Sequence, residues 1–311
     1  MVSRAGLAGG DAPVQDSELW SFFMTAGLNP RVGIALGVLG YFFFSLQDAS
    51  NKWLAASLPV WEVLFVRSVV IVALCCAFGG RRLVERVAAS TMKRSIATRA
   101  GLTLSAWMIF YTASRALPLA QLLTLYFAAP LMITAMAGPL LGERVTRMQW
   151  ASVAIGFVGV LVASDPFGVR LSVATFLVLL SATLWALAMV FTRRIARRES
   201  SMVQMLGTNT VFAVVTGSLC LIEWRAPDGL SWMLMVAVGV LGGLGQYFTF
   251  EAVQRAPASV MAPVEYSALL WAFILGFVVW GDVPVAAVWA GAGLIVVAGV
   301  VLVVGERRVR V

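Results

Sequence analysis

The chain has 311 residues, of which 60% are hydrophobic and 12% are charged, and its formal net charge is +8. Together with a mean hydropathy of +0.90, these values exclude an ordinary soluble domain and indicate a protein with many membrane-spanning segments. The absence of histidine removes histidine proton relays and histidine metal ligands. No carboxylate cluster suggests a metal site, and the three cysteines lie in apolar segments, so no metal, cofactor or disulfide framework is expected.

The first residues, 1–30, have no basic region leading a cleavable apolar segment, so we expect a cytoplasmic arm rather than a signal peptide. Beyond them, ten windows are long and apolar enough to cross a bilayer, which takes about 20 helical residues. The predicted spans are 32–54, 60–80, 96–116, 119–140, 146–164, 172–192, 202–222, 230–252, 258–280 and 284–304. These runs are too long for barrel strands, and lipid excludes open sheets, so the expected fold class is all-α integral membrane.

Basic residues are concentrated in the segments that face the cytoplasm if the N-terminus lies inside. Arg81 and Arg82 follow span two, and Arg193 and Arg194 follow span six. The positive-inside rule therefore predicts that both termini lie in the cytoplasm. Topology accounts for the positive charge, and nothing in the sequence resembles an element that reads a nucleic-acid groove, so no nucleic-acid partner is expected. The expected partner is the lipid bilayer.

Spans one and two carry four ionisable residues toward the outer side, namely Asp48, Lys52, Glu62 and Arg67. Asp48 and Lys52 are spaced i and i+4, on one helical face. The four charges sum to zero, so they can form an ion-pair network that only holds the two spans together. Alternatively, the network gates the outer mouth of a pathway, or Arg67, the deepest of the basic residues, meets an anionic group of a substrate.

Aromatic and amide side chains inside the later spans are candidates for the wall of a substrate cavity. They are Trp107 and Tyr111 in span three, Tyr126 in span four, Trp185 in span six, Gln246 in span eight, and Tyr266 and Trp271 in span nine. The two aromatic residues of span three lie one helical turn apart and form a stripe. Aromatic residues are also common in the cores and interfaces of membrane proteins, so packing alone is the competing interpretation.

Glu265 is an isolated acid, because no basic residue lies within four positions of it in span nine. In apolar surroundings without a cation, the protonated form would be favoured. Glu265 is a candidate for proton coupling or for binding an ammonium group; alternatively, it is a neutral acid that hydrogen-bonds to a neighbouring helix. Pro130 in span four and Pro263 in span nine remove helical hydrogen bonds, so we predict helix breaks that line the pathway.

The second half of the chain resembles the first at an offset of 139 residues. Residues 141–143, Leu-Gly-Glu, recur as 280–282, Trp-Gly-Asp, and Tyr126 corresponds to Glu265. Five predicted spans fall in each copy, and a unit with an odd number of spans must enter the bilayer from opposite sides in its two copies. The predicted domains are an N-terminal arm (1–30), a first five-helix repeat (31–165), a second, inverted five-helix repeat (170–305) and a cytoplasmic tail (306–311).

Short motifs support a family resemblance that extends over residues 32–304. Residues 115–120 (Arg-Ala-Leu-Pro-Leu-Ala), the Ala-Pro-Leu of 129–131 and the Leu-Gly-Glu-Arg of 141–144 have counterparts in the second copy, such as Ala-Pro-Val-Glu-Tyr at 262–266. Together they resemble the EamA-type drug/metabolite transporter (DMT) superfamily, and most of all bacterial amino-acid exporters of the YddG type. The resemblance implies a basket in which spans one to four and six to nine surround a central cavity, with spans five and ten at the periphery.

The sequence thus predicts a secondary transporter that exports amino acids or similar small metabolites by alternating access. An importer of S-adenosylmethionine or another organic cation is the alternative; a membrane enzyme or a passive channel is less favoured, because no catalytic residues are recognisable. Only Arg67 approaches the midplane, which disfavours phosphorylated substrates. Glu265 and Arg67 lie at different depths, so contact of one small molecule with both is left open, as is the choice between monomer and homodimer.

Overall fold

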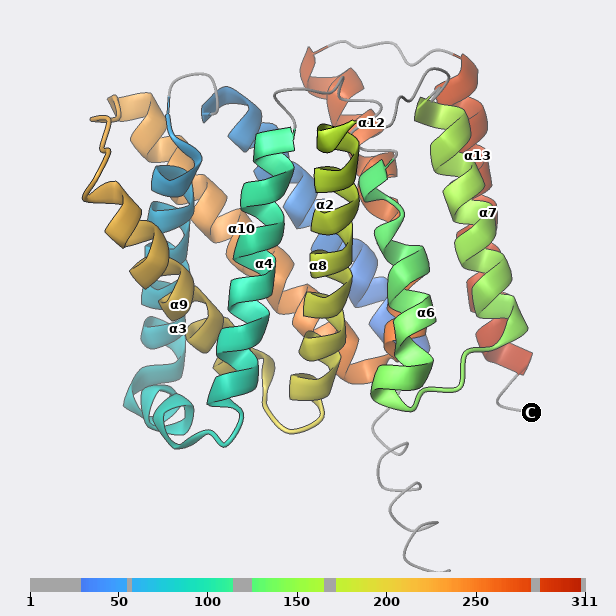
Figure 1. Ribbon diagram of the computed structural model, residues 1–311, viewed down its shortest axis with the longest axis horizontal. Helices are drawn as coiled ribbons and strands as arrows, with labels where there is room; N and C mark the ends of the chain where they lie inside the picture. The colour runs from blue at the N-terminus through green and yellow to red at the C-terminus, as the bar shows by residue number, and fades with distance from the viewer. Residues whose placement is uncertain (1–28, 55–57, 114–124, 165–171, 281–285, 309–311) are drawn as a thin grey trace, which may run out of the picture.

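The computed structural model describes residues 29–54, 58–113, 125–164, 172–280 and 286–308, and the regular elements in these ranges are α-helices (Figure 1). They are α2 (Pro30–Leu54), α3 (Val60–Ala89), α4 (Lys93–Ala113), α6 (Ala129–Leu141), α7 (Arg147–Ser164), α8 (Val173–Ala196), α9 (Ser201–Cys220), α10 (Gly229–Arg255), α11 (Ala258–Val264), α12 (Ser267–Trp280) and α13 (Ala286–Arg308). The all-α class is confirmed for this part of the chain. Most of the predicted arm, 1–28, lies outside it.

Each predicted span coincides with helix in the described residues. Within these described ranges, six segments have the length and composition to cross a membrane: α2, α3, α8, α9, α10 and the segment Ala258–Leu275, which runs through α11 into α12. Shorter apolar helices lie in α6, α7 and α13. Three helices end clearly later than predicted. α3 continues to Ala89 after a bend at Gly80 (φ 58°), α8 continues to Ala196, and α13 runs to Arg308, into the predicted tail.

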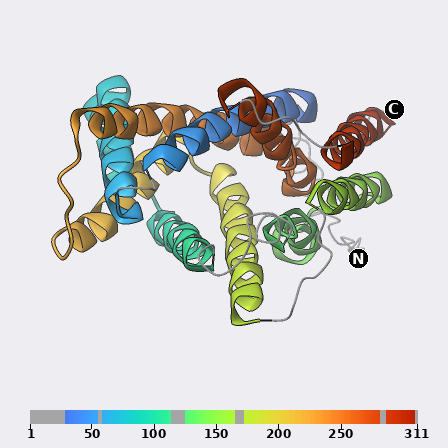
Figure 2. The ribbon, with the colours of Figure 1, turned by 90° about the horizontal axis from the view of Figure 1, so that it is seen from above.

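Helices from the two halves of the chain pair with one another. α2 lies along α10, α4 along α8, α3 along α9, and α7 along α13 (Figure 2). Each pair joins one helix from the N-terminal half to one from the C-terminal half. The α7–α13 pair lies at one end of the bundle, next to α6 and α12 (Figure 1). The two halves are therefore interleaved rather than packed as separate domains.

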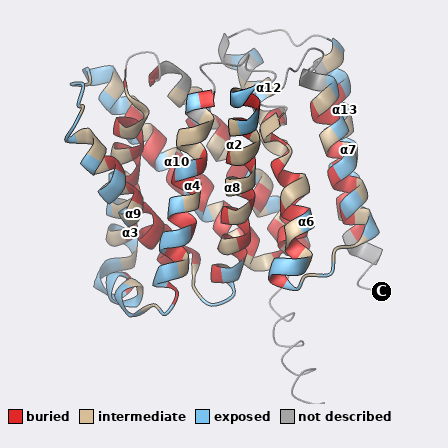
Figure 3. Ribbon diagram, viewed as in Figure 1, coloured by how far each residue is buried: buried red, intermediate tan, exposed pale blue. Residues whose placement is uncertain are grey.

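The helices have buried faces toward the interior of the bundle and exposed faces outside (Figure 3). Many large apolar side chains are exposed, whereas many polar side chains are buried. Phe78, Val173 and Val278 are 83%, 78% and 70% exposed, while Gln204 and Asn209 are fully buried. Exposed apolar area this extensive is unusual in a soluble protein, where it would favour association. It suits a surface in contact with lipid, because helices satisfy their own backbone groups there.

Span nine is divided by a turn at Glu265 and Tyr266, between α11 and α12. Pro263 has no N–H to donate to the preceding helical turn. The chain tightens after it, since the amide of Glu265 donates to the carbonyl of Ala262 at 3.2 Å and the amide of Tyr266 donates to that of Pro263 at 3.3 Å. Span four also has a turn, at Phe127 and Ala128, directly before α6. Pro130 lies in the first turn of α6, where amides have no partner within the helix, so this proline costs no hydrogen bond.

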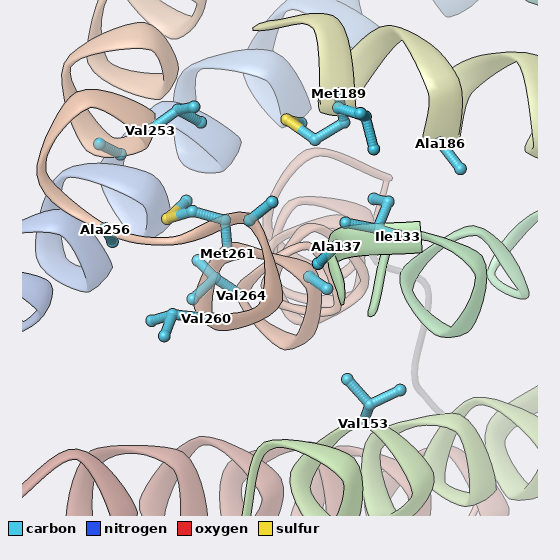
Figure 4. Packing of buried hydrophobic residues seen from close by; sticks show 14 of the residues in the cluster. Ile133, Ala137, Val153, Ala186, Met189, Val253, Ala256, Val260, Met261 and Val264 are labelled. Carbon is cyan, nitrogen blue, oxygen red and sulfur yellow. The ribbon is translucent and has the colours of Figure 1, made fainter. Parts of the chain in front are cut away.

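The short helix α11 is the centre of the largest hydrophobic core cluster. Met261 and Val264 of α11 lie near Ile133 and Ala137 of α6, with side chains of α7, α8 and α10 around them (Figure 4). This packing fixes the C-terminal end of α11. Glu265, the next residue, is therefore held in a defined position between the core and the cavity described below.

Candidate functional site: a central cavity

A cavity of about 420 Å³ lies between α2, α3, α4, α8 and the α11–α12 turn. It extends to the last turn of α2 and the first turn of α3, and thus toward the end of the bundle where α2 ends. Most of its wall is aromatic or aliphatic, with four polar exceptions at Gln47, Asp48, Asn51 and Glu265. The volume and the few polar groups are typical of a site for a small organic molecule.

Glu265 and Trp185 form the best-defined polar contact of this cavity. The indole N–H of Trp185 donates to Oε1 of Glu265 at 2.6 Å. The other carboxyl oxygen, Oε2, is buried and has no hydrogen-bond partner among the described residues. Tyr126 lines the same cavity, so the two positions that correspond under the repeat meet at one site. A carboxyl group with one fixed and one available oxygen can accept a hydrogen bond from a ligand.

The other aromatic candidates have different positions. Trp107 lines the cavity, whereas the side chain of Tyr111 lies outside the described part of the chain. Tyr266 is fully buried and points away, with its hydroxyl donating to the carbonyl of Val153 at 3.4 Å. Its ring packs directly against Gly156 of α7. Glu265 and Tyr266 are neighbours in sequence, but the turn directs them to opposite sides.

Trp271 has a packing position between two helices. Its indole N–H donates to the carbonyl of Val38 at 3.2 Å, and its ring meets Phe42 edge to face, with centroids 4.9 Å apart. These contacts hold α12 against α2. Trp271 does not line the central cavity in the described structure.

Among the described side chains, the contacts of the outer ionisable residues run in two directions. Arg67 donates from Nε to Oε1 of Gln47 at 2.8 Å, and the amide group of Gln47 donates to Asp48 at 3.4 Å. Glu62 faces elsewhere: its carboxylate accepts the backbone amide of Arg225 and anchors the connection between α9 and α10. The side chain of Lys52 lies outside the described part of the chain. Gln47, which sequence reasoning passed over, is therefore the link between Arg67 and Asp48.

The contact between Arg67 and Gln47 depends on a glycine in α10. A Cβ at Gly242 would lie 2.0 Å from Oε1 of Gln47 and 2.7 Å from Nε of Arg67. Only a residue without a side chain lets the backbone of α10 approach this pair so closely. Gly242 therefore sets the position of the Arg67 guanidinium.

We expect Gly242→Ala to destabilise the protein by about 1–3 kcal/mol, because the overpacking outweighs the better helix propensity of alanine. The thermal unfolding midpoint of the purified protein is the measurement. Gly293→Ala is the matched control, since nothing lies within 4 Å of a Cβ at that position in α13. Equal midpoints for the two variants would contradict the packing argument.

A second, smaller chamber of about 30 Å³ adjoins the cavity and shares Phe44, Trp107 and Trp185 with it. Arg67, Arg99 and Gln246 line this chamber rather than the larger cavity. Arg99 is only 6% exposed; it donates to Thr192 at 2.8 Å and to Thr208 at 3.1 Å. Its guanidinium lies over the ring of Phe250, 4.6 Å from the centroid. Arg99 lies near the start of the predicted span 96–116 and was not among the candidate site residues identified in the sequence.

Glu143 forms a buried polar contact at the opposite face of the bundle. It accepts from Nε of Arg193 at 3.0 Å and from Nη2 of Arg197 at 3.4 Å. Its second oxygen accepts the amide of Ala258 at 2.9 Å. The side chains of Glu143 and Arg193 are only 8% and 5% exposed. This cluster ties the α6–α7 connection to the end of α8 and the start of α11, and so joins the two halves of the chain.

A bundle of lipid-compatible helices around a partly polar cavity defines a multi-pass membrane protein of the transporter class. The chain belongs to the EamA-like transporter family, whose model matches residues 31–164 and again residues 172–305. The two matched segments agree with the duplication read from the sequence. The predicted membership of the DMT superfamily is confirmed.

Similar proteins of known function are bacterial transporters of small metabolites. A riboflavin transporter of Vibrio cholerae is 26% identical, over 63% of this chain and 65% of its own length. A pseudopaline exporter of Pseudomonas aeruginosa is 29% identical, over 88% and 96%. An S-adenosylmethionine uptake transporter of Rickettsia prowazekii is 22% identical, over 89% and 94%. A crystal structure with 20% identity covers 93% of this chain and 99% of its own with a TM-score of 0.75, and shares the fold.

Proposed function

We propose that the protein is a secondary transporter that exports amino acids or similar small metabolites across the bacterial inner membrane by alternating access. The observation that carries this proposal is the cavity of about 420 Å³ with the carboxyl group of Glu265 in its wall. Its aromatic lining suits the organic part of a metabolite, and the available oxygen of Glu265 suits an ammonium group. The names of the relatives support a small-metabolite substrate but differ in direction and in chemistry.

The pairing of the helices supports an inverted repeat. In an inverted repeat, the helices of the first half correspond in order to those of the second half: α2 to α8, α3 to α9, α4 to α10, α6 to α11–α12 and α7 to α13. A two-fold axis that relates the halves then exchanges the α2–α10 pair with the α8–α4 pair. The same axis maps the α3–α9 and α7–α13 pairs onto themselves. All four pairs are present in the bundle. Both described ends of the chain lie on one face, where α2 begins and α13 ends (Figure 1), in agreement with the expected cytoplasmic termini.

The arrangement corresponds to an outward-facing conformation under this topology. The cavity extends toward the end of α2, which is the outer side if the N-terminus is cytoplasmic. On the other face, the Glu143 cluster joins the two halves, and α11 fills the space between cavity and cytoplasm. Rocking of the halves that breaks the Glu143 cluster would expose the cavity to the cytoplasm.

Uptake of an organic cation such as S-adenosylmethionine is the second candidate. The buried carboxyl group of Glu265 beside Trp185, in an aromatic wall, is suited to a cationic centre. A relative named as an S-adenosylmethionine uptake transporter supports this alternative. The two candidates share the site and differ in substrate and direction.

Flux in proteoliposomes tests both candidates. The purified full chain is reconstituted and loaded with labelled amino acids, polyamines, S-adenosylmethionine or riboflavin, with and without a pH gradient. We expect saturable, competable counterflow for at least one amino acid, and none in protein-free liposomes. Counterflow restricted to S-adenosylmethionine would favour the second candidate, and no saturable flux of any compound would refute the proposal.

A further inference from the structure

The small chamber next to the cavity has an unusual charge composition. The described residues that line it include two arginines, Arg67 and Arg99, and no aspartate or glutamate. The hydrogen-bond partners of Arg99, Thr192 and Thr208, are neutral hydroxyl groups. Neutral partners satisfy the N–H groups but do not balance a buried positive charge, which is costly to remove from water.

Two more polar groups point to a ligand. Thr103 and Thr249 line the chamber and are 2% and 5% exposed. Their hydroxyl oxygens are buried without a hydrogen-bond partner in the described structure. Buried hydroxyl groups normally have partners, and each of these carries a proton that it can donate. Positive charge together with available hydroxyl donors is the chemistry that binds an anion.

The volume of the chamber limits which anions can bind in it. A water molecule needs about 10–15 Å³ of cavity volume, so the chamber of about 30 Å³ has room for roughly two atoms of that size. Two oxygens of a carboxylate fit this space, as does one halide ion. A phosphate group, with four oxygens, exceeds it.

We propose that this chamber is an anion subsite that holds the carboxylate of the transported metabolite while the rest of the molecule lies in the larger cavity. The proposal rests on the transport function proposed above and names the substrate class, a metabolite with both an amino and a carboxylate group. Trp185 connects the two parts, because it donates to Glu265 and also lines the chamber. The amino group of the metabolite then contacts Glu265, and its carboxylate binds in the chamber beside Arg99.

The test compares two probes that differ only in the anionic group. L-phenylalanine carries an ammonium and a carboxylate, whereas L-phenylalaninamide carries the ammonium alone. Their affinities for the purified full chain are measured by calorimetry. We expect the wild type to bind the amino acid about tenfold more tightly than the amide, or better, because a charge-assisted contact is worth that much. Arg99→Gln should abolish this preference and leave the affinity for the amide unchanged.

Two further variants control for charge and for folding. Arg94→Gln removes a charge from an exposed position of the same helix and should keep the preference. Thr249→Val keeps every charge, removes one available hydroxyl donor, and should reduce the preference severalfold. An undiminished preference for the amino acid in both Arg99→Gln and Thr249→Val overturns the proposal.

Chloride titrations distinguish the carboxylate of the substrate from a resident inorganic anion as the group that the chamber binds. If the chamber accepts the substrate's carboxylate, sodium chloride should compete with L-phenylalanine and not with L-phenylalaninamide. If chloride raises the thermal midpoint only when Arg99 is present but never competes with L-phenylalanine, the chamber holds a resident inorganic anion and the carboxylate assignment is wrong. If neither organic probe binds while this Arg99-dependent chloride effect persists, the amino-acid assignment of the transporter fails and the anion subsite stands.

Discussion

Glu265→Gln is expected to weaken substrate binding by about tenfold or more and to reduce transport accordingly. The substitution keeps the size of the side chain and its contact with Trp185 but removes the negative charge that the second oxygen offers to an ammonium group. A hydrogen bond to a charged group contributes about 1.5–3 kcal/mol, which corresponds to roughly tenfold to a hundredfold in affinity. Counterflow rates and calorimetric affinities for the transported compound are the measurements.

Glu85→Gln is the control for this prediction. Glu85 pairs with a base, Arg81, and both side chains are largely exposed at the bundle surface. Exposed pairs of this kind contribute little, so its transport and affinity should match the wild type. If Glu265→Gln transports at the wild-type rate and affinity, Glu265 is a structural acid and the substrate is held by other groups.

Glu143→Gln is expected to destabilise the conformation in which the cavity reaches the end of α2. The variant leaves Arg193 and Arg197 without their shared carboxylate, and removal of one partner from a buried ion pair costs about 3–5 kcal/mol. We expect a lower thermal midpoint and a population shift toward the opposite conformation. In a variant whose three native cysteines are replaced by serine, a single cysteine introduced at Trp185 and tested with membrane-impermeant thiol reagents from each side reports this shift, since Trp185 lines the cavity.

A double-mutant cycle distinguishes a specific role of the Glu143–Arg193 ion pair from general destabilisation of the protein. Arg193→Gln alone should have a similar effect, and combining it with Glu143→Gln should add little, because the two side chains act through one contact. Additive effects, with labelling from the two sides unchanged, would contradict a role of Glu143 in holding the halves together. Glu85→Gln again serves as the matched surface control.

The positions of the helices could be predicted well from the sequence because the bilayer imposes them. A span must supply about 20 apolar residues whatever its neighbours are, so α2, α8 and α10 begin and end within a few residues of the predicted windows. The break in span nine was also predictable, since Pro263 cannot complete the helical ladder. The exact place of the turn depends on packing around α11, which only the structure contains.

Side-chain directions within the site could not be predicted to the same extent. Glu265 could be singled out because an ionisable group in an apolar span is costly and therefore a candidate for function. The structure places it in the cavity wall. Tyr266 had the same signal but packs on Gly156, a contact between helices far apart in sequence. Arg99 was missed because its partners Thr192 and Thr208 are also distant in sequence, and a base near a cytoplasmic loop is already explained by topology.

The interleaving of the halves has a consequence for biogenesis. Arg99 enters the membrane with the early part of the nascent chain, but Thr192 and Thr208 are synthesised about a hundred residues later. A guanidinium group without partners is costly in the hydrocarbon region of the membrane. Arg99 therefore stays near the membrane interface or in contact with water until α8 and α9 are inserted. The early helices therefore reach their final depth late, and a ribosome-bound intermediate that ends before α8 should remain accessible to insertion factors that a finished protein excludes.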